Sequence, residues 1–477
     1  MTLRKTKIVA TLGPASSSPE MLARMIDAGV NVVRLNFSHG TAENHIRVAN
    51  LVRELAQERR RPIGVLCDLQ GPKIRIGRFE AGKITLSAGD NFILDAECVL
   101  GNRERVGLDY KSLPDEVEPG AVLLLDDGRI VMKVEAVRGR EVHCSVNVGG
   151  VLSNNKGINR QGGGLAAEAL TEKDKEDIKI AAALEADYVA ISFPRNGADV
   201  EYARRLVVEA GGRAGIVAKI ERAEAIPALE EIIDASDVIM VARGDLGVEV
   251  GDAAVPGLQK RMINMARVRN KLVITATQMM ESMISNPIPT RAEVSDVANA
   301  VLDGTDAVML SAESAAGKYP VEAVEAMHRV CLEAEKDYDG QLQHEQRLHS
   351  KFVRIDQSIA MAALHVAAHL KVKAIVTLTQ SGASTMWLSR SNTTVPIFAL
   401  SSEKDTRRRL TLFRGVYPYP FEQNTNDREK ILQDAENELR HRDVLKDGDL
   451  ILLTIGEPIG KSGGTNTLKI VKVGEHR

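Results

Sequence analysis

The chain has 477 residues, and at roughly 100–200 residues per domain this length predicts two to four domains. Hydrophobic residues make up 44% and charged residues 27%, a globular balance that excludes wholesale disorder. The formal net charge is −3 and aromatic residues make up only 3%, so neither charge nor base stacking favours a protein that binds nucleic acid or an acidic membrane.

Cysteine usage and the N-terminus indicate a cellular compartment. Cys67, Cys98, Cys144 and Cys331 lie far apart, so we expect reduced thiols rather than a metal site or a disulfide framework. The N-terminus has no long apolar signal region, and no window approaches the ~20 apolar residues of a membrane span. We therefore expect a soluble cytoplasmic protein with no nucleic-acid or membrane partner.

Short apolar runs alternate with helical patterns at the start of the chain. The first run covers 7–11, and a helix start follows at Ser18-Pro19, where a hydroxyl cap precedes a proline at the first helical position. Runs at 31–37 and 63–68 come next, separated by a helix whose apolar residues repeat at helical spacing over 48–55. These segments predict three strand–helix units.

The rhythm changes between residues 72 and 164, where alternating apolar and polar residues replace the helical pattern. Asp127-Gly128 stands between two such runs and is a hairpin signal. We expect an inserted β-rich lid domain at 72–164, bounded by Gly71-Pro72 and by the weak motif Gly162-Gly163-Gly164, whose plainest interpretation is a hinge. Boundaries of this kind allow a domain to swing.

Five more strand–helix units follow, starting at a capping-box-like Thr171. Their strands are expected at 188–193, 215–220, 238–242, 272–276 and 307–310. Three units before the insertion and five after it make eight, the number in a (β/α)8 barrel, with a doubly wound open sheet as the rival. We therefore predict an α/β protein with three domains: a (β/α)8 TIM barrel at 1–71 and 165–340, the lid at 72–164, and a C-terminal α/β domain at 341–477 that begins with a polar connector at 341–351.

Active sites of such barrels lie at the carboxyl ends of the strands, so polar residues at those positions are the candidates. Six predicted strands end in them: Arg34, Asn36 and Ser38; Asp68; Lys219 and Glu221; Asp245; Thr277; and Ser311 with Glu313. Any one of them alone is as well interpreted as a solvated strand end, but six strands together indicate a site.

The residue types suggest phosphoryl transfer. Glu221 and Asp245 come from adjacent strands and can hold one Mg²⁺, which takes one or two carboxylates and fills its shell with water and substrate oxygens. Lys219 and Arg34 add the positive charge that a phosphorylated, carboxylated substrate requires. The alternative is that Lys219 and Glu221 form an ordinary ion pair.

Long ordered segments of the chain resemble the pyruvate kinase family. They are Thr6–Pro14, Asn31–Gly40, Val241–Gly247, Ala276–Glu293, and Lys219 with the following Ile220–Ala225. The resemblance covers essentially the whole chain in matching order. It implies a phosphotransferase that converts phosphoenolpyruvate and ADP into pyruvate and ATP, the final step of glycolysis, with a lid that excludes water.

The resemblance also implies individual roles. Glu221 and Asp245 would bind Mg²⁺ (or Mn²⁺), Lys219 would stabilise the transferring phosphoryl group and the enolate, and Arg34 would bridge phosphoryl oxygens. The phosphoenolpyruvate site would include Ala242, Gly244, Asp245 and Thr277, and Thr277 with Ser311 and Glu313 would protonate the enolate. Nucleotide contacts are implied for Thr11, Pro14, Arg34, Asn36, His39, Arg75 and Lys173.

One segment departs from the pattern of the K⁺-dependent members. Asn36, Ser38 and Asp68 match three K⁺-ligand positions, but the fourth, usually threonine, is Leu69, which offers only its carbonyl. After the Gly-Pro pair, K⁺-dependent members have glutamate, whereas this chain has Lys73, whose ammonium can supply the ion's charge. We expect activity without K⁺; the alternative is a surface lysine with no role.

A hydroxyl-rich loop in the C-terminal region lies between a predicted strand and a helix, where backbone N–H groups suit a phosphate. It resembles the effector loop of the family, with candidates Thr379, Ser381, Gly382, Ser384, Thr385, Gly464 and Thr465. We expect a phosphorylated metabolite to bind there, the alternative being a capped turn without a ligand. The family is usually homotetrameric, and regulation between subunits would require such an assembly.

Two other functions fit part of the pattern. A Mg²⁺-dependent barrel lyase or aldolase acting on phosphoenolpyruvate or a 2-oxo acid would use Glu221 and Asp245. It would not explain the convergence with an inserted lid of four basic residues, Arg34, Arg75, Lys173 and Lys219. A catalytically silent metabolite sensor would use the C-terminal loop alone, and the intact set of strand-end residues argues against it.

Overall fold

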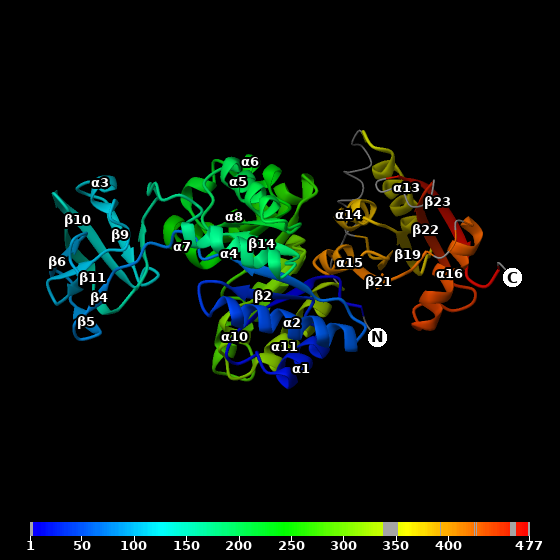
Figure 1. Cartoon of the computed structure of the whole chain (residues 1–477), viewed down its shortest axis with the longest axis horizontal. Helices are drawn as coiled ribbons and strands as arrows, with labels where there is room; N and C mark the ends of the chain where they lie inside the picture. The colour runs from blue at the N-terminus through cyan, green and yellow to red at the C-terminus, as the bar shows by residue number, and fades with distance from the viewer. Residues whose placement is uncertain are drawn as a thin grey trace.

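The computed structural model describes residues 3–336, 352–391, 393–423, 425, 427–457 and 464–475. In Figure 1 a β-rich lobe, a central barrel and an α/β domain follow one another along the long axis of the molecule. The expected connector at 341–351 lies outside the described residues. None of the helices in the described ranges is long and apolar enough to cross a membrane.

Eight parallel strands close the central barrel in the order β1-β18-β17-β16-β15-β14-β3-β2. They are β1 (Lys7–Leu12), β2 (Val32–Asn36), β3 (Gly64–Asp68), β14 (Tyr188–Ile191), β15 (Gly215–Ile220), β16 (Val238–Ala242), β17 (Leu272–Ala276) and β18 (Ala307–Leu310). The predicted (β/α)8 barrel is confirmed. The open sheet is wrong, because the first strand pairs with the last.

Helices between these strands cover the outside of the barrel. They are α1 (Pro19–Ala28), α2 (Ala42–Glu58), α4 (Glu172–Ala183), α5 (Gly197–Glu209), α6 (Leu229–Ala235), α7 (Arg243–Val250), α8 (Val255–Val268), α9 (Arg291–Asp303), α10 (Ala312–Ala315) and α11 (Pro320–Ala334), with short 3₁₀ turns η1 (Ala223–Ala225), η2 (Asp252–Ala254) and η3 (Glu281–Ile284). The expected starts are present: the Ser18 side chain accepts the Met21 N–H, and Thr171 forms a capping box with Asp174.

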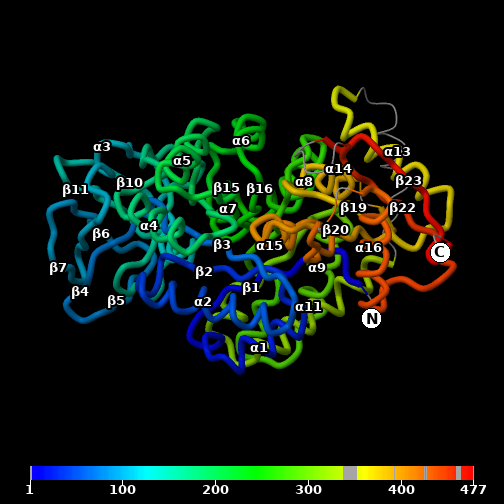
Figure 2. The backbone as a smooth tube through the Cα atoms, turned by 45° about the vertical axis from the view of Figure 1, so that its right-hand side comes forward, coloured from blue at the N-terminus to red at the C-terminus, as the bar shows by residue number. Residues whose placement is uncertain are grey.

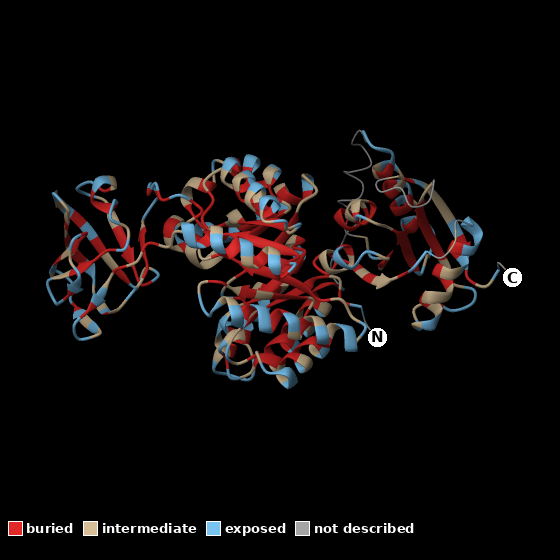
Figure 3. Cartoon of the chain, viewed as in Figure 1, coloured by how far each residue is buried: buried red, intermediate tan, exposed pale blue. Residues whose placement is uncertain are grey.

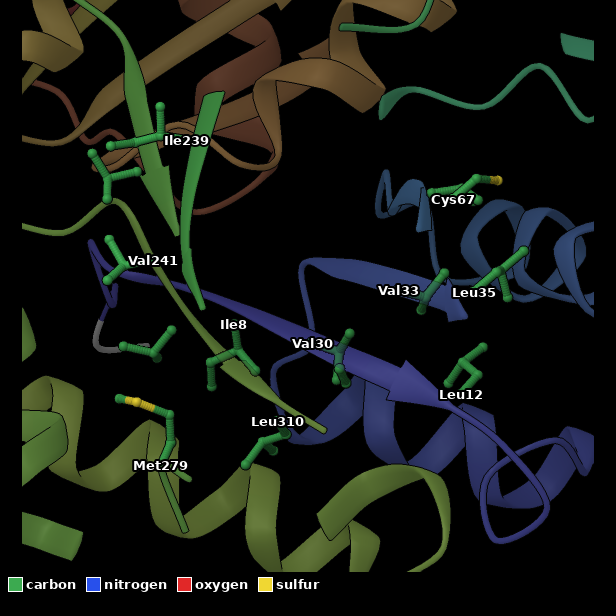
Figure 4. Close-up of a cluster of buried hydrophobic side chains, with 14 of the residues drawn as sticks. Ile8, Leu12, Val30, Val33, Leu35, Cys67, Ile239, Val241, Met279 and Leu310 are labelled. Atoms are coloured by element: carbon green, nitrogen blue, oxygen red, sulfur yellow. The ribbon is translucent and has the colours of Figure 1, made fainter. Parts of the chain in front are cut away.

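The barrel strands are buried on both faces, which explains their continuous apolar runs. Figure 3 shows these strands buried and the outer faces of the helices exposed. One set of side chains, including Ile8, Val33 and Ile239, packs against the helices (Figure 4). The alternate set fills the barrel interior, where Val9 and Met240 belong to the same cluster as residues of the C-terminal domain.

The lobe inserted after β3 is built from short strands. They are β4 (Arg78–Phe79), β5 (Lys83–Leu86), β6 (Asn91–Asp95), β7 (Leu100–Gly101), β8 (Arg105–Gly107), β9 (Val122–Leu125), β10 (Ile130–Arg138), β11 (Glu141–Val148), β12 (Gly150–Ser153) and β13 (Ile158–Arg160), with α3 (Leu113–Glu116). Six of them form one sheet in the order β13-β9-β10-β11-β6-β8. The hairpin expected at Asp127-Gly128 is confirmed, because it joins the antiparallel pair β9 and β10.

The C-terminal domain has a five-stranded sheet in the order β21-β20-β19-β22-β23. Its elements are α13 (Ile355–His369), β19 (Ala374–Leu378), α14 (Ala383–Arg390), β20 (Ile397–Ser401), α15 (Lys404–Leu410), β21 (Val416–Pro420), α16 (Arg428–His441), β22 (Leu450–Gly456) and β23 (Thr465–Lys472). In Figure 2 these elements gather beside the N-terminus, away from the inserted lobe.

Acidic side chains close the amino end of the barrel, where the C-terminal domain docks. Asp187, Asp237 and Asp306 directly precede β14, β16 and β18, and each accepts a backbone N–H from a neighbouring strand at 2.7 to 2.9 Å. Arg408 and Arg390 of the C-terminal domain form ion pairs with Asp187 and Asp306. The C-terminal domain thus leaves the opposite, carboxyl end of the barrel uncovered.

Candidate active site

Lys219 lies at the centre of a buried polar cluster at the carboxyl end of the barrel. Its Nζ is 2.8 Å from Glu221 Oε1, 2.8 Å from Ser192 Oγ and 3.3 Å from Asp68 Oδ1. Burial alone would lower the pKa of Lys219, but the Asp68 and Glu221 carboxylates outweigh it and raise this pKa. The side chain is therefore a fixed ammonium ion.

Arg34 and Asp68 extend the cluster along β2 and β3. Arg34 Nη2 and Nε lie 2.6 and 2.7 Å from Asp68 Oδ2, and Arg34 Nη1 donates to Thr11 Oγ1 at 3.0 Å. Burial opposes ionisation of Asp68, yet Lys219 and Arg34 together lower its pKa. One carboxylate thus holds two cations side by side, which is an arrangement suited to polyanionic groups.

Glu221 follows β15, and Asp245 lies in the first turn of α7 rather than at the end of a strand as expected. Burial raises the pKa of Glu221 to about 7, Lys219 opposes this shift, and the nearby Asp245 carboxylate adds to it. Lys73 Nζ lies 3.1 Å from Asp245 Oδ1 and 3.7 Å from Asp127 Oδ1. Because the Lys73 ammonium lies beside Asp245, the Asp245 carboxylate is in a position to bind a cation.

The donor set fits a hard divalent ion that shares its shell with substrate. In the described part of the chain no group of three or more His, Cys, Asp or Glu side chains could hold a metal. Two carboxylates with an open remainder are what Mg²⁺ or Mn²⁺ accepts when phosphate oxygens and water complete the coordination. Glu221 and Asp245 are therefore the residues that could hold such an ion.

Thr277 and Gly244 meet at the ends of β17 and β16. The Gly244 N–H donates to Thr277 Oγ1 at 2.8 Å, and this hydroxyl donates to the Ala276 carbonyl at 2.7 Å. Thr277 has a φ of 65°, a conformation that costs a β-branched residue energy and is concentrated at functional sites. Arg243 holds the turn by donating to the Thr277 carbonyl at 2.7 Å.

Glu313 is buried at the end of β18 and accepts two backbone N–H groups, from Ser311 at 2.7 Å and from Met280 at 3.2 Å. Burial raises the pKa of its carboxyl group. Both oxygens are therefore engaged by the backbone, and this carboxylate joins the loop after β18 to the loop that carries Thr277. These contacts indicate that Glu313 stabilises the two loops.

The expected nucleotide residues divide between the barrel and the lobe. Thr11, Asn36 and His39 lie together with Arg34 at the ends of β1 and β2, where the His39 N–H donates to the Asn36 carbonyl at 3.1 Å. Lys173 joins them by donating to the Phe37 carbonyl at 2.8 Å. Pro14 follows β1. Arg75 lies in the lobe, and its guanidinium donates to the Asn155 carbonyl there at 3.0 Å.

The positions matched to K⁺ ligands are already in use by the protein. Asn36 Oδ1 accepts the Ser38 N–H at 3.1 Å, Asp68 pairs with Arg34, and the Leu69 carbonyl accepts the Ser192 hydroxyl at 2.8 Å. Sequence reasoning missed Ser192. Because it directly follows β14, the strand-end rule that selected the other candidates would have found it.

The loop after β19 and the first turn of α14 carry four hydroxyl side chains: Thr379, Ser381, Ser384 and Thr385. Thr377 Oγ1 and Ser384 Oγ lie 3.2 Å apart, and the Thr385 and Thr454 hydroxyls are buried without a hydrogen-bond partner. Thr379 Oγ1 accepts the Gly382 N–H at 2.9 Å. Ser381 also lines a cavity of about 630 Å³ between the barrel and α15. Gly464 and Thr465 lie at the start of β23 beside Gly456. Thr454, on β22, was not foreseen.

Comparison with known proteins places this geometry in a family. A model described as pyruvate kinase, barrel domain, matches residues 3–324, and one described as pyruvate kinase, alpha/beta domain, matches residues 357–471. Pyruvate kinase II of Salmonella typhimurium is 54% identical over 477 residues, covering 99% of each chain. The pyruvate kinase of Haemophilus influenzae is 54% identical over 461 residues (95% of this chain, 96% of the relative), and that of Geobacillus stearothermophilus is 43% identical over 470 residues (98% and 80%). With both domains matched and relatives of this identity spanning nearly the whole sequence, the chain belongs to the pyruvate kinase family.

Proposed function

We propose that the cluster around Lys219 transfers the phosphoryl group of phosphoenolpyruvate to ADP. The bond between phosphorus and the enol oxygen breaks, a β-phosphate oxygen of ADP forms the new bond, and the released enolate takes a proton at carbon to become pyruvate. The observation that carries the proposal is the buried ammonium of Lys219 between Glu221, Asp68 and Ser192.

Lys219 and Arg34 act by charge. Phosphoryl transfer asks little covalent chemistry of the protein and depends on neutralising and positioning the reacting groups. Because its neighbours raise the pKa of Lys219, this side chain stays an ammonium ion and stabilises negative charge on the phosphoryl and enolate oxygens. Arg34, fixed by Asp68, presents its guanidinium beside it.

Glu221 and Asp245 would hold Mg²⁺ or Mn²⁺. When bound, this ion would neutralise phosphate and carboxylate oxygens of the substrates. Ala242, Gly244 and Thr277 would line the phosphoenolpyruvate site. Thr277 would pass the proton to the enolate carbon. Ser311 and Glu313 would have a supporting part in that step, because the Glu313 carboxylate accepts backbone N–H groups.

Residues 72–164 would act as a lid over the nucleotide, whose contacts would be Thr11, Pro14, Arg34, Asn36, His39, Arg75 and Lys173. The hinge would lie at Gly162, Gly163 and Gly164, which all have positive φ values of 80° to 94°. Glu249 on α7 supports the returning chain, because it accepts the Asn159 side-chain N–H at 3.2 Å. Closure of the lid would exclude water from the enolate.

A direct assay tests the activity. We expect pyruvate and ATP to form in equal amounts from phosphoenolpyruvate and ADP with Mg²⁺, and Lys219→Met to abolish both. Pyruvate without ATP, or products of carbon–carbon cleavage, would instead favour a lyase or aldolase. No turnover in the wild type, with ligand binding confined to the C-terminal domain, would indicate a sensor.

We also propose that activity does not require K⁺. Arg34 and Lys219 already neutralise Asp68, and Lys73 adds a further positive charge at Asp245. Turnover in buffer free of K⁺ and Na⁺ should match turnover in about 100 mM KCl, a salt level near the ~0.15 M of physiological solutions. Lys73→Glu should introduce K⁺ stimulation. A large stimulation of the wild type by K⁺ would contradict the proposal.

A phosphorylated metabolite is the proposed effector at the start of α14. The support is the pair of buried, unpartnered hydroxyls of Thr385 and Thr454, which a phosphate oxygen would satisfy. Sugar phosphates and AMP, titrated separately, should shift the phosphoenolpyruvate saturation curve, and Thr385→Val should abolish the shift. If none of these compounds shifts the curve, the loop is a capped turn without a ligand.

A cytoplasmic homotetramer is the proposed form of the enzyme. The four cysteines are free, as a reducing compartment requires. Light scattering of the purified protein would measure the assembly, and a mass other than four chains would contradict this state.

A further inference from the structure

The chain at the end of β14 lies between two neighbouring strands of the site. In the barrel, β14 stands between β3 and β15. Ser192 directly follows β14 and is 1% exposed. Its Oγ accepts a hydrogen from Lys219 Nζ at 2.8 Å and donates to the Leu69 carbonyl at 2.8 Å. The hydroxyl therefore uses both its donor and its acceptor capacity to join the ends of β3 and β15.

Phe193 shows that the backbone here is shaped for the same neighbour. Its φ is 57°, an uncommon conformation for a bulky residue. In this conformation the Phe193 N–H donates to Glu221 Oε2 at 3.1 Å, while Arg222 holds the Phe193 carbonyl at 3.2 Å. The two residues after β14 thus contact both functional side chains of β15.

Packing fixes Ser192 from the other side. A Cβ atom added to Gly71 would lie 2.5 Å from the Ser192 Cβ, so the chain at 69–71 rests directly on this serine. The Gly71 N–H is itself held by Asp174 at 3.0 Å. Ser192 consequently lies between the turn after β3 and the ammonium of Lys219, and its hydroxyl contacts both.

We propose that Ser192 is a positioning residue for Lys219. The inference rests on the proposed role of Lys219 and adds the group that sets its direction. Lys219 forms ion pairs with the carboxylates of Asp68 and Glu221, and among the described residues the Ser192 hydroxyl is the side-chain group that accepts a hydrogen bond from its ammonium. The two ion pairs attract the charge with little directional constraint, and the hydrogen bond to the neutral Ser192 hydroxyl supplies the direction.

Removal of the hydroxyl leaves the charge of Lys219 in place but frees its head group. A misplacement of about 1 Å can cost on the order of 100-fold in rate. We therefore expect Ser192→Ala to lower kcat by about 10- to 100-fold with the KM for phosphoenolpyruvate and the Mn²⁺ affinity within twofold of wild type. Glu221 keeps its Phe193 N–H partner in this variant, so the metal site should persist.

Ser236→Ala is the matched control, because Ser236 is equally buried and its hydroxyl donates only to the Ile233 carbonyl, before β16 at the other end of the barrel. It should leave kcat within twofold of wild type. Mn²⁺ binding, measured by electron paramagnetic resonance, separates loss of positioning from loss of fold. A normal kcat in Ser192→Ala, or a fall in Mn²⁺ affinity equal to the fall in kcat, would overturn the proposal.

A crystal structure of Ser192→Ala tests the same inference without activity. We expect Lys219 Nζ to turn away from the position it holds beside Leu69 and Ser192, with Glu221 unmoved. An unmoved Lys219 Nζ would overturn the positioning role whatever the kinetics. A wild type without phosphoryl transfer would refute the proposed function, while the crystallographic comparison would still decide whether Ser192 orients Lys219.

Discussion

The ion pair between Arg390 and Asp306 joins the last helix turn of α14 to the start of β18, and its removal tests how firmly the C-terminal domain is docked. Both side chains are 1% exposed. Arg390 Nη1 lies 2.7 Å from Asp306 Oδ2 and also donates to the Lys271 carbonyl at 3.0 Å, while Nη2 reaches Asp306 Oδ1. The substitution Arg390→Met removes all of these donors and leaves the carboxylate buried.

The expected cost follows from that burial. Breaking a buried pair by deleting one partner typically costs about 3–5 kcal/mol, because the remaining charge is uncompensated. Asp306 retains the Val273 N–H at 2.9 Å, so we expect the lower part of this range, about 3 kcal/mol, which is roughly a hundredfold in the unfolding equilibrium. Replacing both partners in Arg390→Met/Asp306→Leu should recover most of the loss.

The single tryptophan provides the assay. Trp387 lies on α14 one turn before Arg390, so its fluorescence during urea unfolding reports this domain contact. The matched control is Arg129→Met, since Arg129 is 77% exposed and pairs with Asp126 only at 3.9 Å, a contact worth about 0–1 kcal/mol. If Arg390→Met unfolds within 1 kcal/mol of this control, the pair does not hold the docked domain.

Three further predictions concern the site, the lid and the buried lysine below the barrel. Lys219→Met should lower kcat by about a thousandfold or more in the coupled assay, whereas Lys179→Met, at a side chain of α4 that is 64% exposed, should not. The Glu249 carboxylate accepts the Asn159 side-chain N–H and the Ala223 N–H through its two oxygens, and Glu249→Gln loses one of these acceptors. Hydrogen exchange over 159–165 should therefore become faster. Exchange no faster than in the matched control Glu118→Gln, a change at an exposed side chain, would contradict this. Burial lowers the pKa of Lys7 to about 7, so between pH 7 and 10 the unfolded chain binds a proton that the folded chain lacks. The free energy of unfolding should therefore rise with pH by up to about 1.4 kcal/mol per pH unit. An identical slope in Lys7→Met would show that another group is responsible.

The barrel could be predicted because each of its strands is buried on both faces and separated from the next by a helix. Such strands appear in the sequence as isolated apolar runs, and counting the runs is enough to fix the fold. The strand pairing of the inserted lobe could not be predicted in this way. Its sheet places β6 beside β8 in a parallel pair and β13 beside β9, and pairings between distant short strands leave no periodic signal.

Site residues could be predicted where a side chain directly follows a strand. They could not be predicted where their position depends on an unusual backbone conformation or on the placement of the inserted lobe. Lys219, Glu221 and Asp68 meet because they end adjacent strands. Phe193 has a left-handed backbone conformation, and because bulky residues rarely adopt it, the sequence does not predict it there. The sequence predicts that Lys73 supplies the charge of K⁺, but it does not predict that the neighbours of this lysine are Asp245 and Asp127, a contact that depends on where the lobe docks.

The two ends of the barrel are linked by very short strands, and this limits how independent the domains can be. β14 is preceded by Asp187, which pairs with Arg408, and followed by Ser192, which accepts a hydrogen bond from Lys219. Its four residues span only about 13 Å at 3.3 Å per residue. A rotation of the C-terminal domain that preserves the Arg408 pair should therefore move the foot of this strand, and if Ser192 positions Lys219 as proposed, it should also displace Lys219 Nζ, because a fully buried strand has little room to absorb the movement along its length.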